Sequence, residues 1–147
     1  METTQLIESE IPLVAKWNVQ LHEDEGSRPL SIEAAEKRYR RWFRENSYKG
    51  VIFKVDGAPI GYVIYEHRKE HPDSRDTETI YIRQFFIARE FRRKGYGTTA
   101  FRIVVDKFVP NNTSVKLNVK SSNPLGQLFW ETLGFKPENT EYELLKS

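Results

Sequence analysis

Residues 79–108 change from the pattern of a strand to the pattern of a helix across a short basic turn. A mostly apolar run over 79–87 predicts a long strand, and apolar residues three and four positions apart over 97–108 predict an amphipathic helix. Three successive cations, then Gly95 and Gly97, lie between them. A strand that leads into a helix in this way favours an α/β fold, because the helix must cover the sheet to bury its apolar side.

The segments on either side predict the remaining elements. A helix over 10–21 and a second helix that begins after Ser31 come first, and strands over 51–55 and 60–65 follow, joined by a hairpin turn at Asp56-Gly57. The stretch 71–76 reads as a loop. After the basic turn and its helix we expect a strand over 114–119, a helix over 124–133 and a last strand over 142–145. This order predicts an α/β fold in which a mixed, mostly antiparallel twisted sheet carries helices on both faces, as a single domain over 1–147.

Composition excludes several classes of protein. The net charge of +2 argues against a general nucleic-acid binder, and glutamates interleaved with the cations of the second helix account for that basic face by pairing four residues apart. No apolar run is long enough to span a membrane, and the start lacks the pattern of a signal peptide, so we expect no membrane association and a cytoplasmic location. The absence of cysteine removes disulfides and a covalent thiol intermediate, and the three histidines lack metal-ligand spacing.

The basic turn itself favours an anion site. Free N–H groups at a helix N-terminus point outward, the helix dipole favours an anion there, and Gly95 and Gly97 allow close approach of the backbone. The main-chain amides from Arg92 to Thr98 are therefore predicted to bind a pyrophosphate. A plain solvated loop is the simplest alternative. A dinucleotide site is another, since Gly95-x-Gly97-x-x-Ala100 matches its fingerprint, but the loop is long and the expected acidic residue is missing. A phosphate-loop NTPase would need Gly-Lys-Ser/Thr, which does not occur.

Two motifs together resemble the GNAT superfamily of acyl-CoA N-acyltransferases. Arg92-x-x-Gly95-x-Gly97 is similar to its central motif Q/R-x-x-G-x-G/A. The run from Asn123 through Phe129-Trp130 to Gly134-Phe135 resembles its second motif, in which an Asn precedes a helix that ends in Leu-Gly-Phe. The resemblance covers roughly residues 5–146. It implies acetyl-CoA (coenzyme A) as cofactor, two central strands that splay apart to admit the pantetheine arm, and a homodimer as an open option.

The resemblance also implies roles for individual residues. The backbone of Phe86, Ile87 and Arg89 would bind the arm as an added strand would. The remaining cofactor contacts would come from the basic turn and the last helix: Arg92, Arg93, Lys94, Gly95, Tyr96, Gly97, Thr98, Asn123, Phe129 and Trp130. For Asn123 a simple helix N-cap is an equally good interpretation, and for Phe129 core packing is the better one.

The implied reaction is an N-acetyltransfer to a primary amine of a small-molecule or peptide acceptor, by direct attack, since no cysteine is available for a relay. The N–H of Ile87 is the implied oxyanion donor, and Glu66 and Glu78 are candidate bases. The acidic run Glu23-Asp24-Glu25 offers further bases and would attract a cationic acceptor, and it joins Arg83, Gln84 and Tyr65 as candidate acceptor contacts. Many family members carry a Tyr where this chain has Trp130, and an indole is no general acid. A non-catalytic acyl-CoA sensor of the same fold is therefore the alternative.

Overall fold

The computed structural model describes residues 1–69 and 78–147, so the predicted loop over 71–76 lies outside the described residues. Within them, one sheet has the order β1-β2-β3-β4-β5. Its strands are β1 (Glu2–Gln5), β2 (Lys49–Val55), β3 (Ala58–Lys69), β4 (Glu78–Ile87) and β5 (Ser114–Lys116). The pairings from β1 to β4 are antiparallel and β4 pairs with β5 in parallel, which confirms a mixed, mostly antiparallel sheet.

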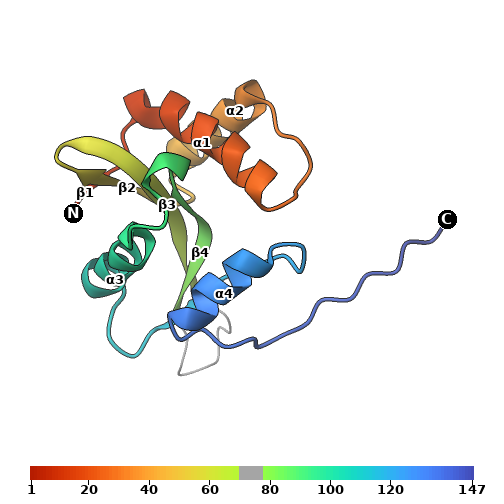
Figure 1. The fold of residues 1–147 in the computed structure, drawn as a ribbon. Helices are drawn as coiled ribbons and strands as arrows, with labels where there is room; N and C mark the ends of the chain where they lie inside the picture. Colours follow the sequence, from red (N-terminus) through yellow and green to blue (C-terminus); the bar gives the residue numbers. More distant parts are fainter. Residues whose placement is uncertain (70–77) are drawn as a thin grey trace.

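Helices cover both faces of this sheet (Figure 1). The helices α1 (Ile11–Asp24) and α2 (Ile32–Glu45) pack on one face, and α3 (Tyr96–Phe108) and α4 (Pro124–Thr132) lie on the other, with short 3-10 turns η1 (Glu8–Glu10) and η2 (Arg89–Phe91). Side chains alternate along the strands, so Ile52 and Tyr62 join the α1/α2 core while Phe53 and Val63 join the α3 core. No helix in the described ranges is long and apolar enough to cross a bilayer.

Local chemistry sets the element boundaries much as expected. The Ser31 hydroxyl accepts a hydrogen bond from the Ala34 N–H at 3.1 Å and begins α2. Asp56 and Gly57 have φ of 51° and 78°, the left-handed values that a two-residue hairpin requires. Gly134 has φ of 99° directly after α4, where a glycine ends the helix without steric cost.

The sheet opens between β4 and β5. Only Thr79, Ile80 and Tyr81 of β4 pair with β5, at Ser114, Val115 and Lys116, while β4 continues to Ile87. In the described part of the chain, the stretch of β4 after Tyr81 has no strand on that edge. The splayed arrangement expected from the resemblance is therefore present.

Three strand predictions need correction. The strand predicted over 114–119 ends at Lys116. The last strand predicted over 142–145 is wrong, because that segment belongs to no strand and runs away from the body of the molecule (Figure 1). The sequence analysis missed β1, which pairs with β2 through residues 2–5.

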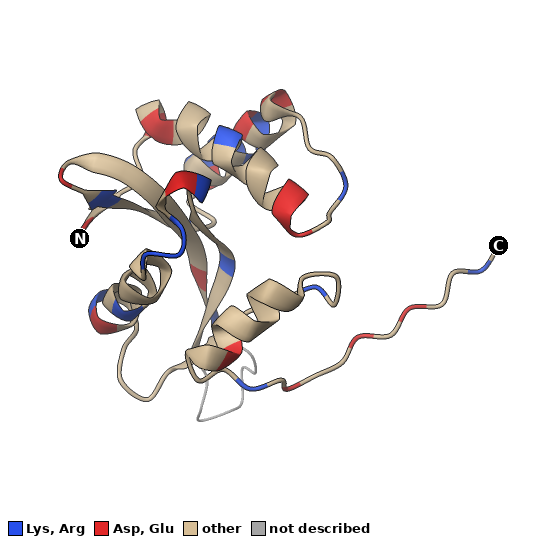
Figure 2. Ribbon diagram, in the orientation of Figure 1, with Lys and Arg blue, Asp and Glu red and all other residues tan. Residues whose placement is uncertain are grey.

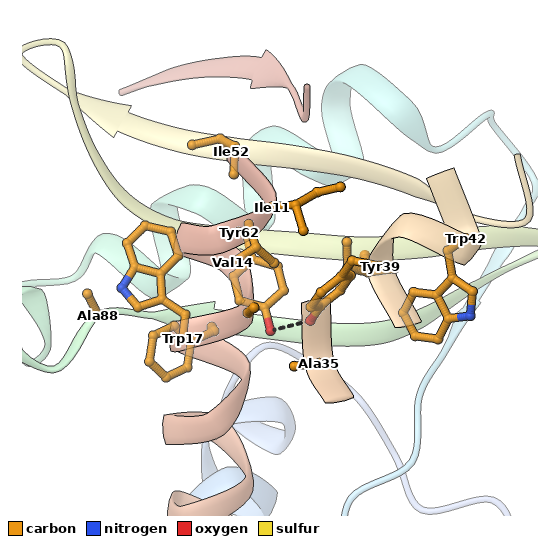
Figure 3. Packing of buried hydrophobic residues seen from close by; sticks show 12 residues of the cluster. Ile11, Val14, Trp17, Ala35, Tyr39, Trp42, Ile52, Tyr62 and Ala88 are labelled. Atoms are coloured by element: carbon orange, nitrogen blue, oxygen red, sulfur yellow. Dashed lines mark hydrogen bonds between the residues drawn. The ribbon is translucent and has the colours of Figure 1, made fainter. Parts of the chain in front are cut away.

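A buried polar cluster ties α2 to the sheet (Figure 3). The hydroxyls of Tyr39 and Tyr62 lie 3.2 Å apart, and both donate to Oε1 of Gln84 on β4, the Tyr62 bond measuring 3.1 Å. Burial raises the pKa of Tyr39 to about 12 and raises the pKa of Tyr62 well above 10. Both phenols are therefore held in the neutral form.

We expect these two tyrosines to make the fold sensitive to alkali. An unfolded tyrosine ionises near pH 10 and Tyr39 near pH 12, so the folded state keeps its proton more tightly. This difference in pKa contributes to the free energy of unfolding. The contribution is fully present below about pH 10 and is lost as pH rises from there towards 12. Absorbance at 295 nm should report late ionisation of Tyr39 and Tyr62, together with loss of circular dichroism. Ionisation of all seven near pH 10 with the fold intact would contradict this prediction.

Candidate functional site

The open edge of β4 presents backbone groups towards the gap. The Ala88 N–H donates to the Ile60 carbonyl of β3 at 2.8 Å, and backbone groups of an antiparallel strand alternate between its two neighbours. The N–H groups of Phe85 and Ile87 therefore point away from β3 and towards the gap. The Phe86 carbonyl faces β3, since it lies 2.2 Å from the position a Cβ would take at Gly61. The expectation that the Phe86 backbone binds an extended ligand is corrected: Phe85 has that orientation.

The first turn of α3 supplies further donors. Gly95 caps the helix with φ of 81°, and Arg93 has φ of 62°. The Thr99 N–H, at 3.1 Å from the Gly95 carbonyl, makes the first helical hydrogen bond. The amides of Tyr96, Gly97 and Thr98 thus precede the helical ladder. Figure 2 shows the basic segment that leads into this helix from the end of β4, and Arg93 and Lys94 in it are exposed.

The helix α4 lies opposite the open edge of β4 and is held there by aromatic packing. A Cβ at Gly97 would come within 3.2 Å of Cε2 of Phe129, so α3 and α4 meet at this glycine. The Trp130 ring contacts four aromatic rings, with centroid distances of 4.8 to 5.4 Å: Phe85, Phe101, Phe129 and Phe135. Core packing is therefore the main role of this tryptophan. The Asn123 side chain accepts from the Gly126 N–H at 3.0 Å and caps α4, as the simpler interpretation predicted.

An ion-pair network joins the end of α1 to the basic segment. Asp24 accepts from Nη2 of Arg89 at 3.0 Å and from Nη2 of Arg92 at 2.7 Å, and Glu23 accepts from Arg89 at 2.9 Å. Nε of Arg92 donates to the Ile87 carbonyl at 2.7 Å. Arginines thus compensate the charges of Glu23 and Asp24, so neither carboxylate is included among the proposed acceptor contacts. The Arg92 side chain thus ties the end of β4 to α1, and its N–H bonds the Arg89 carbonyl at 3.3 Å, so neither is free for a ligand.

Glu25 follows this network on the loop between α1 and α2. Its carbonyl accepts from the Ser122 hydroxyl at 3.1 Å, so the loop reaches the turn before α4. Burial raises the pKa of the Glu25 carboxyl, while His22 and Lys120 oppose that shift. A half-buried carboxylate with a raised pKa is a better proton acceptor than an exposed one.

The two candidate bases on the strands, Glu78 and Glu66, lie far from Ile87. A strand rises about 3.4 Å per residue, so Glu78 at the start of β4 is about 30 Å from Ile87 at its end. Glu66 pairs with Tyr81 in register, about 20 Å from Ile87 by the same rise, and bonds Arg68 at 2.5 Å. Neither carboxylate can serve a reaction at Ile87, which corrects both base predictions.

The three candidate acceptor contacts on the sheet, Tyr65, Gln84 and Arg83, lie in different surroundings. Tyr65 is 4% exposed and packs against Phe108 on the α3 face, so it is a core residue rather than an acceptor contact. Gln84 is engaged by Tyr39 and Tyr62. Arg83 is exposed beside a register shift between β3 and β4, which leaves it as the strand residue able to meet a ligand.

These groups surround the open end of β4. The free edge of β4 lies on one side, α4 packs opposite it, and the N-terminus of α3 with its cations lies at the end. The sequence analysis missed Phe85 and Ser122, and the hydrogen-bond alternation of β4 is the signal that identifies Phe85. In the described ranges, no three His, Asp or Glu side chains gather as metal ligands.

Comparisons with known proteins identify the family. A model of the Acetyltransferase (GNAT) family matches residues 14–135. The L-2,4-diaminobutyric acid acetyltransferase of Nocardia farcinica is 29% identical over 87 residues, which make up 58% of this chain and 42% of that protein. The matched part therefore spans about two fifths of the length of that relative.

Solved structures share the fold. A GCN5-related N-acetyltransferase from Ralstonia eutropha JMP134 superimposes with a TM-score of 0.75 at 18% identity, over 98% of this chain and 97% of that one. A protein named as a predicted acetyltransferase from Clostridium acetobutylicum, solved with acetyl-CoA, gives a TM-score of 0.75 at 16% identity, over 98% and 95% of the two chains.

Proposed function

Because the chain belongs to the GNAT acetyltransferase family, we propose that it transfers an acetyl group from acetyl-CoA to a primary amine. The observation that carries the proposal is the free edge of β4 after Tyr81, which leads to the N-terminus of α3. An extended chain with an amide-rich arm and a pyrophosphate end fits both features at once.

The residues present fit acetyl-CoA. The amide of Phe85 would hold the pantetheine arm, and the amides from Arg93 to Thr98 would hold the pyrophosphate, with Arg93 and Lys94 adding positive charge. The Arg92 N–H is not among these donors, because it bonds the Arg89 carbonyl at 3.3 Å. Asn123, Phe129 and Trp130 would form the α4 side of the cofactor site. When bound, the cofactor supplies an acetyl thioester, which an amine can attack directly.

The chain would assist this attack in two ways. The Ile87 N–H would donate a hydrogen bond to the carbonyl oxygen on which charge develops. The Glu25 carboxylate would accept the proton that an ammonium acceptor must lose, since an alkylammonium has a pKa of about 10.4. Asp24, the neighbour of Glu25, bonds Arg92, and Arg92 bonds the Ile87 carbonyl, so the loop that carries Glu25 is tied to the end of β4.

We expect Glu25→Gln to lower kcat by about 100-fold and to leave the Kd for acetyl-CoA within about threefold, because a general base contributes roughly that factor. Since burial raises the Glu25 pKa, the wild-type rate should fall as pH drops through that pKa. The variant should lose this acid limb of its pH profile. Glu66→Gln is the matched control and should retain its rate. Equal rates for both variants would remove Glu25 from the mechanism.

The acceptor is the least defined part of the reaction. The relative from Nocardia farcinica is named for a small diamino acid, which supports starting with short diamines and diamino acids. Glu25 would attract the cationic end of such an acceptor, and Arg83 could pair with a carboxylate. A peptide N-terminus or lysine is the second class to test.

Thiol release over an amine panel tests the proposal. The chain has no cysteine, so a thiol reagent reports only the free coenzyme A that is produced. We expect release with at least one amine and a rise in Tm on addition of acetyl-CoA. A Tm rise without release on any amine would favour the non-catalytic sensor, the alternative that Trp130 suggests. Absence of both effects would reject the proposed function.

The domain organisation and the cellular location are also proposals. We propose that residues 1–147 fold as one domain, which limited proteolysis would test by the absence of a stable smaller fragment. We also propose a cytoplasmic location, which fractionation of the producing cell would test.

A further inference from the structure

The guanidinium of Arg38 has no acidic partner. Arg38 lies on α2 and is half-buried, and its Cζ is 5.0 Å from the ring centroid of Trp42. Its Nη2 donates to Oδ1 of Asn18 on α1, a side chain that is fully buried. Among the residues that the structure describes, no Asp or Glu pairs with Arg38, whereas Arg40 pairs with Glu36 at 3.3 Å. A charge that is partly removed from water without a counter-ion is costly, so this position favours an anion from outside the chain.

Two buried donors lie beside this charge. Nε of Arg38 and Nδ2 of Asn18 are both buried without a hydrogen-bond partner in the described ranges. Buried N–H groups are rarely left without an acceptor, so the surroundings of Arg38 contain too few acceptor atoms. A carboxylate supplies acceptor oxygens and a negative charge together, and it matches the fork of a guanidinium.

The two buried phenols place Arg38 near the candidate site. Burial raises the pKa of Tyr39 and of Tyr62, and the Arg38 charge opposes that rise because it lies near both hydroxyls. These hydroxyls meet between α2 and the sheet (Figure 3), and both donate to Oε1 of Gln84 on β4. Gln84 precedes Ile87 by three residues, which is about 10 Å along the strand. An anion at Arg38 would therefore lie on the α1/α2 side of the proposed reaction centre.

The carboxylate of Glu25 lies at a matching distance along α1. Asn18 and Glu25 are seven residues apart, which is about two helical turns, so they share one side of the helix at a separation of about 10 Å. Glu25 is the group proposed to accept the proton of the acceptor amine. One molecule with a carboxylate near Arg38 and an amine near Glu25 would need several bonds between the two groups. An amino acid with a second amine at the end of its side chain has this form.

We propose that Arg38, held in position by Asn18, binds the carboxylate of the acceptor, and that the acceptor is a free diamino acid rather than a polyamine or a protein lysine. This inference rests on the proposed function and adds the substrate class to it. Arg38 is then a residue that determines specificity, and Asn18 is a positioning residue. The exposed Arg83 of β4 is the competing partner for the carboxylate.

Calorimetric titration tests the proposal without turnover, in the presence and absence of coenzyme A. The probes are lysine, ornithine and diaminobutyrate, each compared with the diamine that lacks its carboxylate: cadaverine, putrescine and diaminopropane. We expect at least one diamino acid to bind at least about tenfold more tightly than its diamine, because a charge-assisted pair is gained. Equal affinities within every pair, or no binding of any diamino acid, would overturn the proposal.

The Arg38→Met variant tests the assignment of the carboxylate. Methionine keeps an apolar stem beside Trp42 and removes the charge, so the preference for the diamino acid should disappear. The affinity for the diamine should change by less than about threefold. An equal loss of affinity for both ligands would mean that Arg38 has only a structural role, and it would overturn the proposal.

Three further variants complete the test. Asn18→Asp has nearly the same shape and gives Arg38 a carboxylate within the chain, so it should also abolish the preference, with the Tm retained. Arg41→Met changes an exposed cation of the same helix and should keep the preference. Loss of the preference in Arg83→Met, but not in Arg38→Met, would assign the carboxylate to Arg83 and overturn the proposal. Thiol release without any preference for a carboxylate would reject this inference alone, whereas absence of both release and coenzyme binding would reject the proposed function.

Discussion

Gly97→Asp is expected to weaken acetyl-CoA binding by at least about 100-fold. The N–H of Gly97 lies in the first turn of α3, where we propose that the pyrophosphate binds, and a carboxylate there would repel that anion. Isothermal titration calorimetry of wild type and variant measures the change directly.

Two controls separate charge at the site from other effects. A Cβ at Gly97 lies 3.2 Å from Cε2 of Phe129, so Gly97→Ala needs a small shift of that ring and should cost less than about tenfold in affinity. Arg102→Glu reverses an exposed charge further along α3 and should leave affinity nearly unchanged. Wild-type affinity in Gly97→Asp, with the fold intact, would contradict the proposed pyrophosphate position.

Trp130→Ala is expected to lower the free energy of unfolding by about 3 kcal/mol, the low end of the cost of truncating a large aromatic side chain, because Trp130 is half-buried. The indole contacts four rings that come from β4, α3, α4 and the segment after α4. Its removal leaves a cavity where these elements meet. For a domain of this size the change corresponds to a Tm lower by about 6 to 12 °C.

Urea unfolding followed by circular dichroism measures the loss. Trp130→Phe keeps an aromatic ring in the cluster and should cost about 1 kcal/mol. An alanine variant as stable as the wild type would mean that these ring contacts do not hold α4 in place. Trp130 would then be assigned to the proposed cofactor site alone.

Local signals explain which parts of the fold could be predicted from sequence. The Asp56-Gly57 turn, the Ser31 cap and the stripe of α3 each depend on neighbouring residues, and the structure confirms them. The strand β1 was missed because Glu2, Thr3, Thr4 and Gln5 carry no apolar alternation, and pairing with β2 orders them. The strand predicted over 142–145 is absent, because an alternating pattern does not supply the neighbouring strand that such a segment needs.

The candidate site likewise combines features that the local sequence predicts with features that depend on tertiary contacts. Gly95, Gly97 and the cations form one continuous motif, so the sequence predicted the position of the helix N-terminus. The partners of Glu23 and Asp24 are more than sixty positions away, at Arg89 and Arg92, and no local pattern reveals such pairs. The choice between Phe85 and Phe86 depends on the hydrogen-bond alternation set by β3, which is a tertiary property.

Backbone amide spectra recorded with and without coenzyme A test the central claim most directly, because each N–H gives its own signal. The account predicts large shifts for Tyr96, Gly97 and Thr98 and for Phe85 and Ile87, while the signals of Phe86 and Ala88, whose amides bond β3, should move much less. Unchanged signals at the start of α3, or shifts confined to another part of the sheet, would contradict it.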